Sequence, residues 1–483
     1  MTPTATLVAA LALASPPGGR PAAAADAVPI LAAARKGRAY DLLASLADTV
    51  GPRLAGSPGA EAAVRWAAEW FRQNGFEVRL EPVRVRRWVR GEERAEVLSA
   101  GAGPGQALAV TALGNSPPTP PGGAAGEVVE VGSLEELRAL GDGVRGRVVL
   151  FQHDMKQAAD YGRFAPLRMR GPAEAARLGA AAALVRSLAT ASLRTPHTGA
   201  TLFPAGGPRV PAAAVSVEDA ELLHRLLQRG PVKVRLVLGC GAGEPAEVES
   251  ANVVAELRGR ERPEEVVVVG AHIDSWDLGA GAVDDGAGVA MVMEALRIAK
   301  AQPSPPRRTL RAVLFMNEEN GLDGGVGYYR AHRAEGDRHV AAVEADGGAG
   351  RPTGVRVTAG QGGIELVQAW ARPLAALGAD RVSPDGGGAD ISPLAYARVP
   401  RLSIEQDASR YFDWHHSAAD TLDKVDPREL SEATAALAWI AWSLADAAET
   451  LPRPLAPESA PSWATEPPGT APGAPAGKGA ERR

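Results

Sequence analysis

The chain has 483 residues, 45% of them hydrophobic and 23% charged, which is enough to form the cores of two domains. Its net charge of −5 excludes the broad basic surface of a nucleic-acid-binding protein, and its single cysteine excludes an internal disulfide. Beyond the first residues no apolar run reaches the roughly 18 residues that a membrane span needs, so no transmembrane helix is expected.

Residues 1–25 have features of a secretory signal. An apolar stretch at 7–14 (LVAALALA) is followed by small residues at 23–25 that suit a cleavage site, although no Lys or Arg precedes the apolar stretch. We therefore predict a signal peptide and a secreted or periplasmic protein.

Residues 26–105 form the N-terminal part of the main domain. The patterns predict helices at 40–50 and 60–74 and a strand at 76–85, with the turn-rich segment GPRLAGSPG between the two helices. The Gly- and Pro-rich segment 101–123 indicates a domain boundary.

Residues 106–247 read as a self-contained insert. Short strands are predicted at 126–131, 146–151, 212–215 and 232–237, helices at 173–178 and 219–228, and an apolar run lies at 180–185. His153, His197 and His224 are scattered, with no carboxylate at ligand spacing, so we expect structural roles or surface positions for them.

Residues 248–450 alternate between strands and helices: strands at 252–257, 266–270, 309–316, 341–345 and 401–404, and helices at 287–300, 325–334, 364–377 and 427–450. This alternation predicts an α/β domain with a mostly parallel central sheet covered on both faces. Residues 451–483 are rich in Pro, Gly, Ala and Ser without periodicity and are predicted to be a disordered tail.

Polar residues follow several of these strands. They are His272 and Asp284, then Glu318 and Glu319, then Asp346, and finally His415 and His416. Because ligands bind at the carboxyl ends of strands in an open α/β sheet, we expect these residues to share one edge. Imidazole and carboxylate ligands suit zinc, and five ligands with one shared carboxylate suit two zinc ions. One of the adjacent glutamates would then remain free as a general base.

Four motifs in this order, HIDSWDLGAGAVDDGAG, MNEENG, EADGG and HHSAADT, resemble the co-catalytic di-zinc exopeptidases that include bacterial leucyl aminopeptidases. The Ser-Trp-Asp of the first motif is most similar to the carboxypeptidase Q (plasma glutamate carboxypeptidase) branch. The resemblance covers roughly residues 39–448 and implies a three-layer zinc-exopeptidase fold. The insert, with LRTPHTG and VPAAAVSVEDAELLHRLL, resembles a protease-associated domain.

The resemblance also implies a role for each motif residue. His272 and Asp346 would bind one zinc ion and Glu319 and His416 the other, while Asp284 would bridge them. Glu318 would be the general base, and Asp274 would orient His272. His415 and Asp390 are expected near the substrate, whereas Asp277, Asp285 and Asp420 are expected to make turn hydrogen bonds.

We therefore expect a zinc-dependent exopeptidase that cleaves dipeptides or short peptides as an aminopeptidase or dipeptidase, and the resemblance allows a homodimer. Two alternatives remain open on the same fold. One is a glutaminyl-cyclase-like transferase with a single zinc ion, and the other is a non-catalytic binding protein of the transferrin-receptor type.

Overall fold

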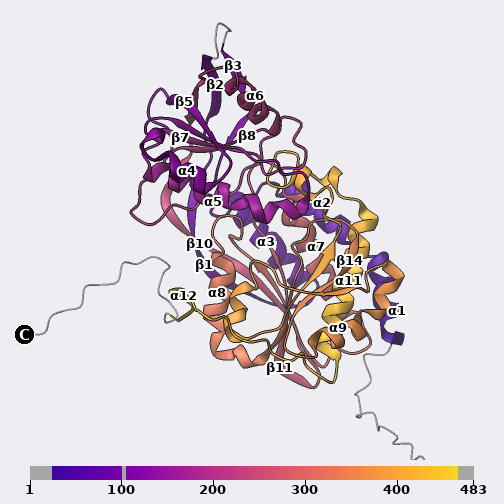
Figure 1. Cartoon of the computed structure of the whole chain (residues 1–483). Coiled ribbons are helices and arrows are strands. Elements are labelled where there is room, and N and C mark those ends of the chain that lie inside the picture. Colours follow the sequence, from indigo (N-terminus) through magenta and orange to yellow (C-terminus); the bar gives the residue numbers. More distant parts are fainter. Residues whose placement is uncertain (1–23, 100–104, 466–483) are drawn as a thin grey trace, which may run out of the picture.

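The computed structural model describes residues 24–99 and 105–465, which form two lobes with one eight-stranded sheet each (Figure 1). The main lobe contains both ends of the described chain. The inserted lobe comprises residues 93–238. The chain enters it after β1 (Glu77–Val89) and leaves it into β10 (Gly241–Leu257), and these two strands pair antiparallel to each other.

The sheet of the main lobe is mixed. Its strand order is β1-β10-β12-β11-β13-β16-β14-β15, where the strands not yet defined are β11 (Arg262–His272), β12 (Arg308–Phe315), β13 (His339–Glu344), β14 (Pro352–Thr358), β15 (Val382–Pro384) and β16 (Arg401–Gln406). The four central strands β12, β11, β13 and β16 are parallel, whereas β10 and β14 flank them antiparallel. The predicted mostly parallel sheet is thus confirmed only at its centre. The prediction missed β14, which follows β13 without a helix between them, and β15, which has only three residues.

Helices cover both faces of this sheet. Val267 and Val269 of β11 pack into one core, with α7 and α11, and Val266 and Val268 pack into another, with α8. A strand buried on both faces explains the run of four valines. The helices of the main lobe are α1 (Ala24–Arg35), α2 (Ala39–Thr49), α3 (Pro58–Gln73), α7 (Ala287–Lys300), α8 (Asp323–His332), α9 (Gly363–Ala371), α10 (Tyr411–Trp414), α11 (Pro427–Asp446) and α12 (Ser462–Thr465).

Helix α1 was not predicted. Its residues Ala27, Ile30 and Ala34 are buried, and the helix packs against α11. Alanine occurs all around this helix, so the sequence shows little amphipathic periodicity there.

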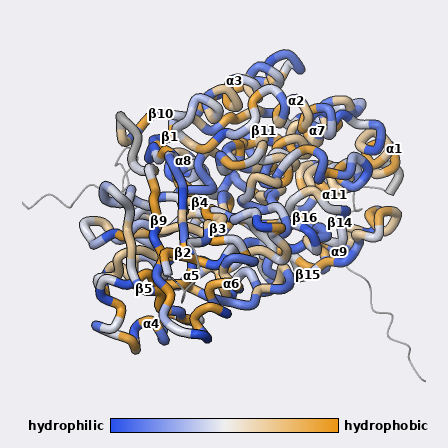
Figure 2. Tube along the Cα trace, turned by 90° about the horizontal axis from the view of Figure 1, so that it is seen from above, coloured by the Kyte–Doolittle hydropathy of each residue, from blue (hydrophilic) through white to orange (hydrophobic). Residues whose placement is uncertain are grey.

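The inserted lobe has its own sheet, in the order β3-β2-β9-β5-β6-β7-β8-β4. Its elements are β2 (Glu93–Ser99), β3 (Gln106–Leu108), β4 (Val110–Ala112), β5 (Ala124–Val131), α4 (Leu134–Leu140), β6 (Val148–Phe151), α5 (Tyr161–Arg177), β7 (Ala182–Arg186), β8 (Ala212–Val215), α6 (Val217–Leu227) and β9 (Lys233–Leu238). Because β2 belongs to this sheet, the inserted lobe begins before residue 106. Hydrophilic and hydrophobic residues alternate along β9, which buries one of its faces (Figure 2).

Helix α5 is much longer than the helix predicted at 173–178. It contains Pro166 and Pro172, which sequence reasoning treats as helix breakers, and it packs on the sheet through Phe164, Ala165 and Leu167. The remaining helical turns are short: Gly141–Val144, Ala158–Asp160, Ala282–Gly286, Arg333–Arg338, Arg372–Leu377, Ser392–Ala397 and Leu422–Lys424.

Part of the predicted disordered tail is ordered. Arg453 donates hydrogen bonds to the carbonyl oxygens of Asp337 and His339, and Trp463 packs edge-on against Tyr329 and Tyr396. The prediction was therefore wrong for residues 451–465, because their proline-rich composition gives no indication of these specific contacts. Residues 466–483 and most of the predicted signal peptide, residues 1–23, lie outside the described residues. In the described part of the chain, no helix combines the length and apolarity needed to cross a membrane.

Candidate metal-dependent active site

Four neighbouring strands deliver polar residues to one edge of the main sheet. Strand β11 ends at His272, β12 leads into Glu318 and Glu319, and β13 leads into Asp346. Strand β16 leads through α10 to His416. These strands are parallel and adjacent, so their carboxyl ends meet, as predicted.

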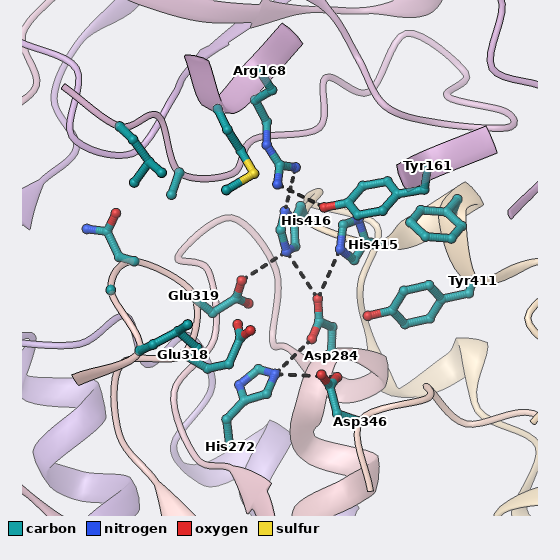
Figure 3. Close-up of a pocket in the computed structure, with 17 residues that line it drawn as sticks. Tyr161, Arg168, His272, Asp284, Glu318, Glu319, Asp346, Tyr411, His415 and His416 are labelled. Atoms are coloured by element: carbon teal, nitrogen blue, oxygen red, sulfur yellow. Dashed lines mark hydrogen bonds and ion pairs between the residues drawn. The ribbon is translucent and has the colours of Figure 1, made fainter. Parts of the chain in front are cut away.

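Asp284 lies at the centre of this cluster and divides its two oxygen atoms between two groups (Figure 3). Its Oδ1 lies 3.1 Å from Nε2 of His272, which is also 3.7 Å from Oδ1 of Asp346. Its Oδ2 lies 3.3 Å from Nε2 of His416, which is also 2.9 Å from Oε2 of Glu319. The arrangement suits a carboxylate that bridges two cations.

Two sets of ligand atoms are compact enough to hold an ion. Those of His272, Asp284 and Asp346 lie within 4.8 Å of one another, as do those of Asp284, His415 and His416. His415 is therefore an alternative ligand for the second ion, since its Nε2 lies 3.6 Å from Oδ2 of Asp284.

Hydrogen bonds at the far side of each imidazole distinguish the three histidines. A metal-binding histidine normally donates its other ring N–H to a nearby oxygen. Nδ1 of His272 lies 3.1 Å from the carbonyl oxygen of Asp274, and Nδ1 of His416 lies 3.3 Å from the carbonyl oxygen of Thr198. Nδ1 of His415 is buried and has no hydrogen-bond partner among the described residues. This difference favours His272 and His416 as ligands.

Asp274 supports the site in a different way from the one predicted. Its carboxylate lies 3.9 Å from Nδ1 of His272, so the backbone carbonyl and not the carboxylate makes the orienting hydrogen bond. The carboxylate instead accepts from the backbone N–H of Asn317 at 2.8 Å and of Glu318 at 3.1 Å. Asp274 thus holds the turn that presents Glu318.

Two residues that the sequence did not single out for the site fix the loop carrying Asp284. Arg53 is fully buried and donates to the carbonyl oxygens of Ile273 at 2.7 Å, Ala280 at 2.6 Å and Gly281 at 2.8 Å. It lies in GPRLAGSPG, where nothing marks an arginine as buried. Asp420, expected to make turn hydrogen bonds, accepts from the backbone N–H groups of Val283 and Asp284 in this distant loop.

The other acidic residues of the loop have separate roles. Asp285 accepts a local hydrogen bond from the backbone N–H of Gly288 and a second one from the backbone N–H of His272, 13 residues earlier. Asp277 was expected to do the same, but it forms an ion pair with Arg90, with a shortest distance of 2.7 Å. Neither carboxylate is used at the centre of the cluster.

The charges of the cluster suit cations. Burial lowers the pKa of His416, but Glu319 and Asp284 outweigh burial and raise it to about 10. Burial likewise lowers the pKa of His272, and the hydrogen bonds to Asp284 and Asp346 raise it well above its usual value. The carboxylates that draw protons onto these imidazoles would be neutralised equally well by divalent ions. The residues therefore fit a metal centre.

A cavity of about 480 Å³ opens onto this cluster and is lined by both lobes. Glu318 and His415 line it from the main lobe, and Tyr161 and Arg168 line it from α5 of the inserted lobe. Burial and the neighbouring carboxylates raise the pKa of Glu318 well above its usual value. His415 lines the same cavity, and its contact with the substrate stays a prediction.

Asp390 does not line this cavity, contrary to its predicted place near the substrate. It is buried, and neither carboxylate oxygen has a hydrogen-bond partner among the described residues. Burial, together with Glu344, raises the pKa of Asp390 well above its usual value. The GGGAD loop carries Asp390 behind the site, where Glu344 accepts from its backbone N–H.

Comparisons with known proteins agree with this site. Residues 252–441 match the model of peptidase family M28. The chain is 39% identical to carboxypeptidase Q of Mus musculus over 417 residues, which cover 86% of this chain and 87% of the relative. Carboxypeptidase Q of Homo sapiens matches with the same identity and coverage.

Solved structures show the same fold. A crystal structure of a peptidase M28 precursor from Shewanella amazonensis has a TM-score of 0.85 and 37% identity, and covers 90% of this chain and 99% of that one. An aminopeptidase from Aneurinibacillus has a TM-score of 0.62 and 20% identity, with 89% and 98% covered, and its likeness concerns the fold alone. This chain is therefore a metallopeptidase that belongs to peptidase family M28, in the group of carboxypeptidase Q.

Proposed function

We propose that this metallopeptidase holds two zinc ions and acts as an exopeptidase on dipeptides or short peptides. The observation that carries the proposal is the division of the two Asp284 oxygens between two groups of ligand atoms. His272 and Asp346 would complete one zinc site, and Glu319 and His416 the other. A zinc aminopeptidase from Bacillus subtilis, whose solved structure has the same fold with a TM-score of 0.62 and 20% identity, is consistent with this choice of metal.

Two bound zinc ions would supply a polarised substrate carbonyl and a water molecule whose pKa is lowered toward about 7. Glu318 would accept the proton of this water and return it to the leaving amine. Its place supports this role, because it lines the cavity next to the ligands and takes part in none of the ion pairs between them. The backbone of Glu318 is held by Asp274. A raised pKa suits a carboxylate that must hold a proton between the two steps.

The site argues against the two alternatives. A single-zinc transferase needs no bridging carboxylate, whereas Asp284 faces two groups of ligand atoms. A binding protein without activity needs no buried glutamate beside the ligands. Metal stoichiometry, a cyclisation assay and a hydrolysis assay separate the three functions.

The decisive experiment compares the wild type with Glu318→Gln. The wild type should bind two zinc ions, lose hydrolysis with 1,10-phenanthroline and recover it when zinc is added. Glu318→Gln should keep both ions and lose turnover by about 10²- to 10⁴-fold. Glu365→Gln, an exposed change of the same charge on α9, is the matched control. Turnover close to wild type in Glu318→Gln would exclude the proposed base.

A panel of dipeptides with free, amino-blocked or carboxyl-blocked ends defines the exopeptidase class. We also propose that the inserted lobe is a protease-associated domain, that the protein is exported and that it forms a homodimer. N-terminal sequencing of the exported protein and light scattering test the last two proposals.

A further inference from the structure

Arg168 is a buried cation without a carboxylate partner among the described residues. It is 6% exposed, and its guanidinium contacts a hydroxyl group, a backbone carbonyl group and the imidazole of His416. Nη2 donates to the hydroxyl oxygen of Tyr161 at 2.8 Å, Nη1 donates to the carbonyl oxygen of Thr198 at 3.3 Å, and Nε is buried without a hydrogen-bond partner. Buried arginines are normally paired with an anion. The N–H groups of Arg168 are therefore available to an anion that enters the cavity.

The guanidinium of Arg168 lies at the wall of the cavity, directly above His416 and Asp284 (Figure 3). Nη1 is 3.3 Å from Nδ1 of His416, whose Nε2 faces Asp284. The loop that contains Gly199 leaves space for the guanidinium of Arg168, since a Cβ atom at Gly199 would lie 2.3 Å from it. A glycine is also needed there because its φ of +137° is unfavourable for other residues.

We propose that Arg168, together with Tyr161, binds the free α-carboxylate of the residue that follows the scissile bond. This inference rests on the proposed exopeptidase function and specifies its substrate class. A guanidinium offers a planar fork of N–H donors that matches a carboxylate, and the hydroxyl of Tyr161 is close enough to donate to the same group.

The contacts of His416 leave the guanidinium free for this role. If Nδ1 of His416 donates its proton to the carbonyl oxygen of Thr198, it has no lone pair to accept a hydrogen bond from Arg168. Nη1 then keeps only its long contact with Thr198. A substrate carboxylate would satisfy the remaining N–H groups.

The position of Arg168 also sets the length of the substrate. Only the imidazole ring of His416 separates the guanidinium from Asp284. One extended residue spans about 3.5 Å and two span about 7 Å. The carboxylate of a single residue beyond the scissile bond can therefore reach Arg168. In a longer leaving group the terminal carboxylate would lie beyond the guanidinium. The geometry points to a preference for dipeptides.

The test compares a dipeptide with a free carboxylate and the same dipeptide as its amide. For Arg168→Gln, KM should rise at least about 30-fold for the free dipeptide and change little for the amide. Tyr161→Phe removes one hydroxyl from the surface of the cavity and should weaken the same preference by about 5-fold. Arg170→Gln, an exposed change on the same helix, is the matched control.

Binding provides a second measurement that does not depend on turnover. In the Glu318→Gln background, titration calorimetry should show that Arg168→Gln weakens binding of the free dipeptide but not of the amide. An equal loss with both substrates would mean that Arg168 acts through His416, and it would overturn the inference. Equal KM values for both substrates in the wild type would overturn it as well. Either result leaves the proposed function intact, which fails separately if no dipeptide is hydrolysed in a zinc-dependent way.

Discussion

Thr198 and His416 form a reciprocal pair of contacts across the boundary between the two lobes. The backbone N–H of Thr198 donates to the carbonyl oxygen of His416 at 2.8 Å, and Nδ1 of His416 lies 3.3 Å from the carbonyl oxygen of Thr198. His416 has a φ of +61°, which is uncommon for a residue with a side chain, so it needs support from its surroundings. The inserted lobe provides this support and is thereby part of the active site.

The first prediction concerns the two adjacent histidines. His416→Ala should bind one zinc ion fewer than the wild type, because it removes the imidazole whose far side is held by Thr198. His415→Ala should keep two ions and change KM instead, since His415 lines the cavity. Metal analysis of the two purified variants gives the answer. The loss of an ion from His415→Ala and not from His416→Ala would reverse the assignment.

A second prediction concerns Asp420, whose carboxylate accepts from the backbone N–H groups of Val283 and Asp284. Asp420→Ala should weaken zinc binding by about 10- to 100-fold, because the carboxylate of Asp284, which we propose to bridge the two ions, loses its support. Competition with a zinc chelator measures this change. Asp423→Ala alters an exposed carboxylate nearby and should bind zinc like the wild type. Equal zinc affinities for the two variants would show that the loop holds its shape without Asp420.

A third prediction concerns Arg53. Arg53→Met should lower the free energy of unfolding by about 3 kcal/mol, because several buried carbonyl oxygens lose their donor. Chemical denaturation of the zinc-depleted protein measures this loss without a contribution from the metal. Arg38→Met is the control, since the side chain of Arg38 is exposed and pairs with the exposed Asp41, and this variant should stay within about 0.5 kcal/mol of the wild type.

The fourth prediction concerns the pH dependence of stability and a histidine, His339, that is not part of the candidate metal site. Burial lowers the pKa of His339 to about 4, against its ordinary value of 6.5. The unfolded chain therefore binds a proton between pH 6.5 and 4 that the folded protein does not, so stability falls as the pH decreases through this range. The contribution of this residue at pH 5 is about 2 kcal/mol.

His339→Gln should remove this part of the pH dependence. The difference in unfolding free energy between pH 7 and pH 5 should be about 2 kcal/mol smaller in the variant than in the wild type. Denaturation curves at both pH values measure it, and the comparison cancels the contributions of all other histidines. Identical pH dependence in the two proteins would show that Tyr328, which hydrogen-bonds to His339, tolerates the charged imidazole.

Much of the main lobe follows from local patterns. The valine run of β11 and the apolar stripe of α11 identify their elements because burial requires a continuous apolar surface. The prediction that strand ends bring His272, Asp284, Glu319, Asp346 and His416 together is also met, since parallel neighbours align their carboxyl ends.

Other elements were not predicted from the sequence because their sequence patterns are weak or misleading. The alanine-rich α1 lacks periodicity, and α5 contains two prolines. Residues 451–465 have the composition of a disordered tail, although Arg453 and Trp463 contact the main lobe. Asp390 seemed close to the substrate by its place in the chain, but its carboxylate is buried and does not line the cavity.

The residue types that we propose as metal ligands and their order along the chain are properties of the sequence, because each of these residues ends or follows a strand whose pattern is local. The orientation of these ligands is a property of the tertiary structure. It depends on contacts between residues more than 130 positions apart, such as Arg53 with Gly281, Asp420 with Asp284 and Thr198 with His416. Such pairs leave no periodic trace, since a hydrogen bond to a distant backbone group requires only a suitable donor or acceptor at the right place in space.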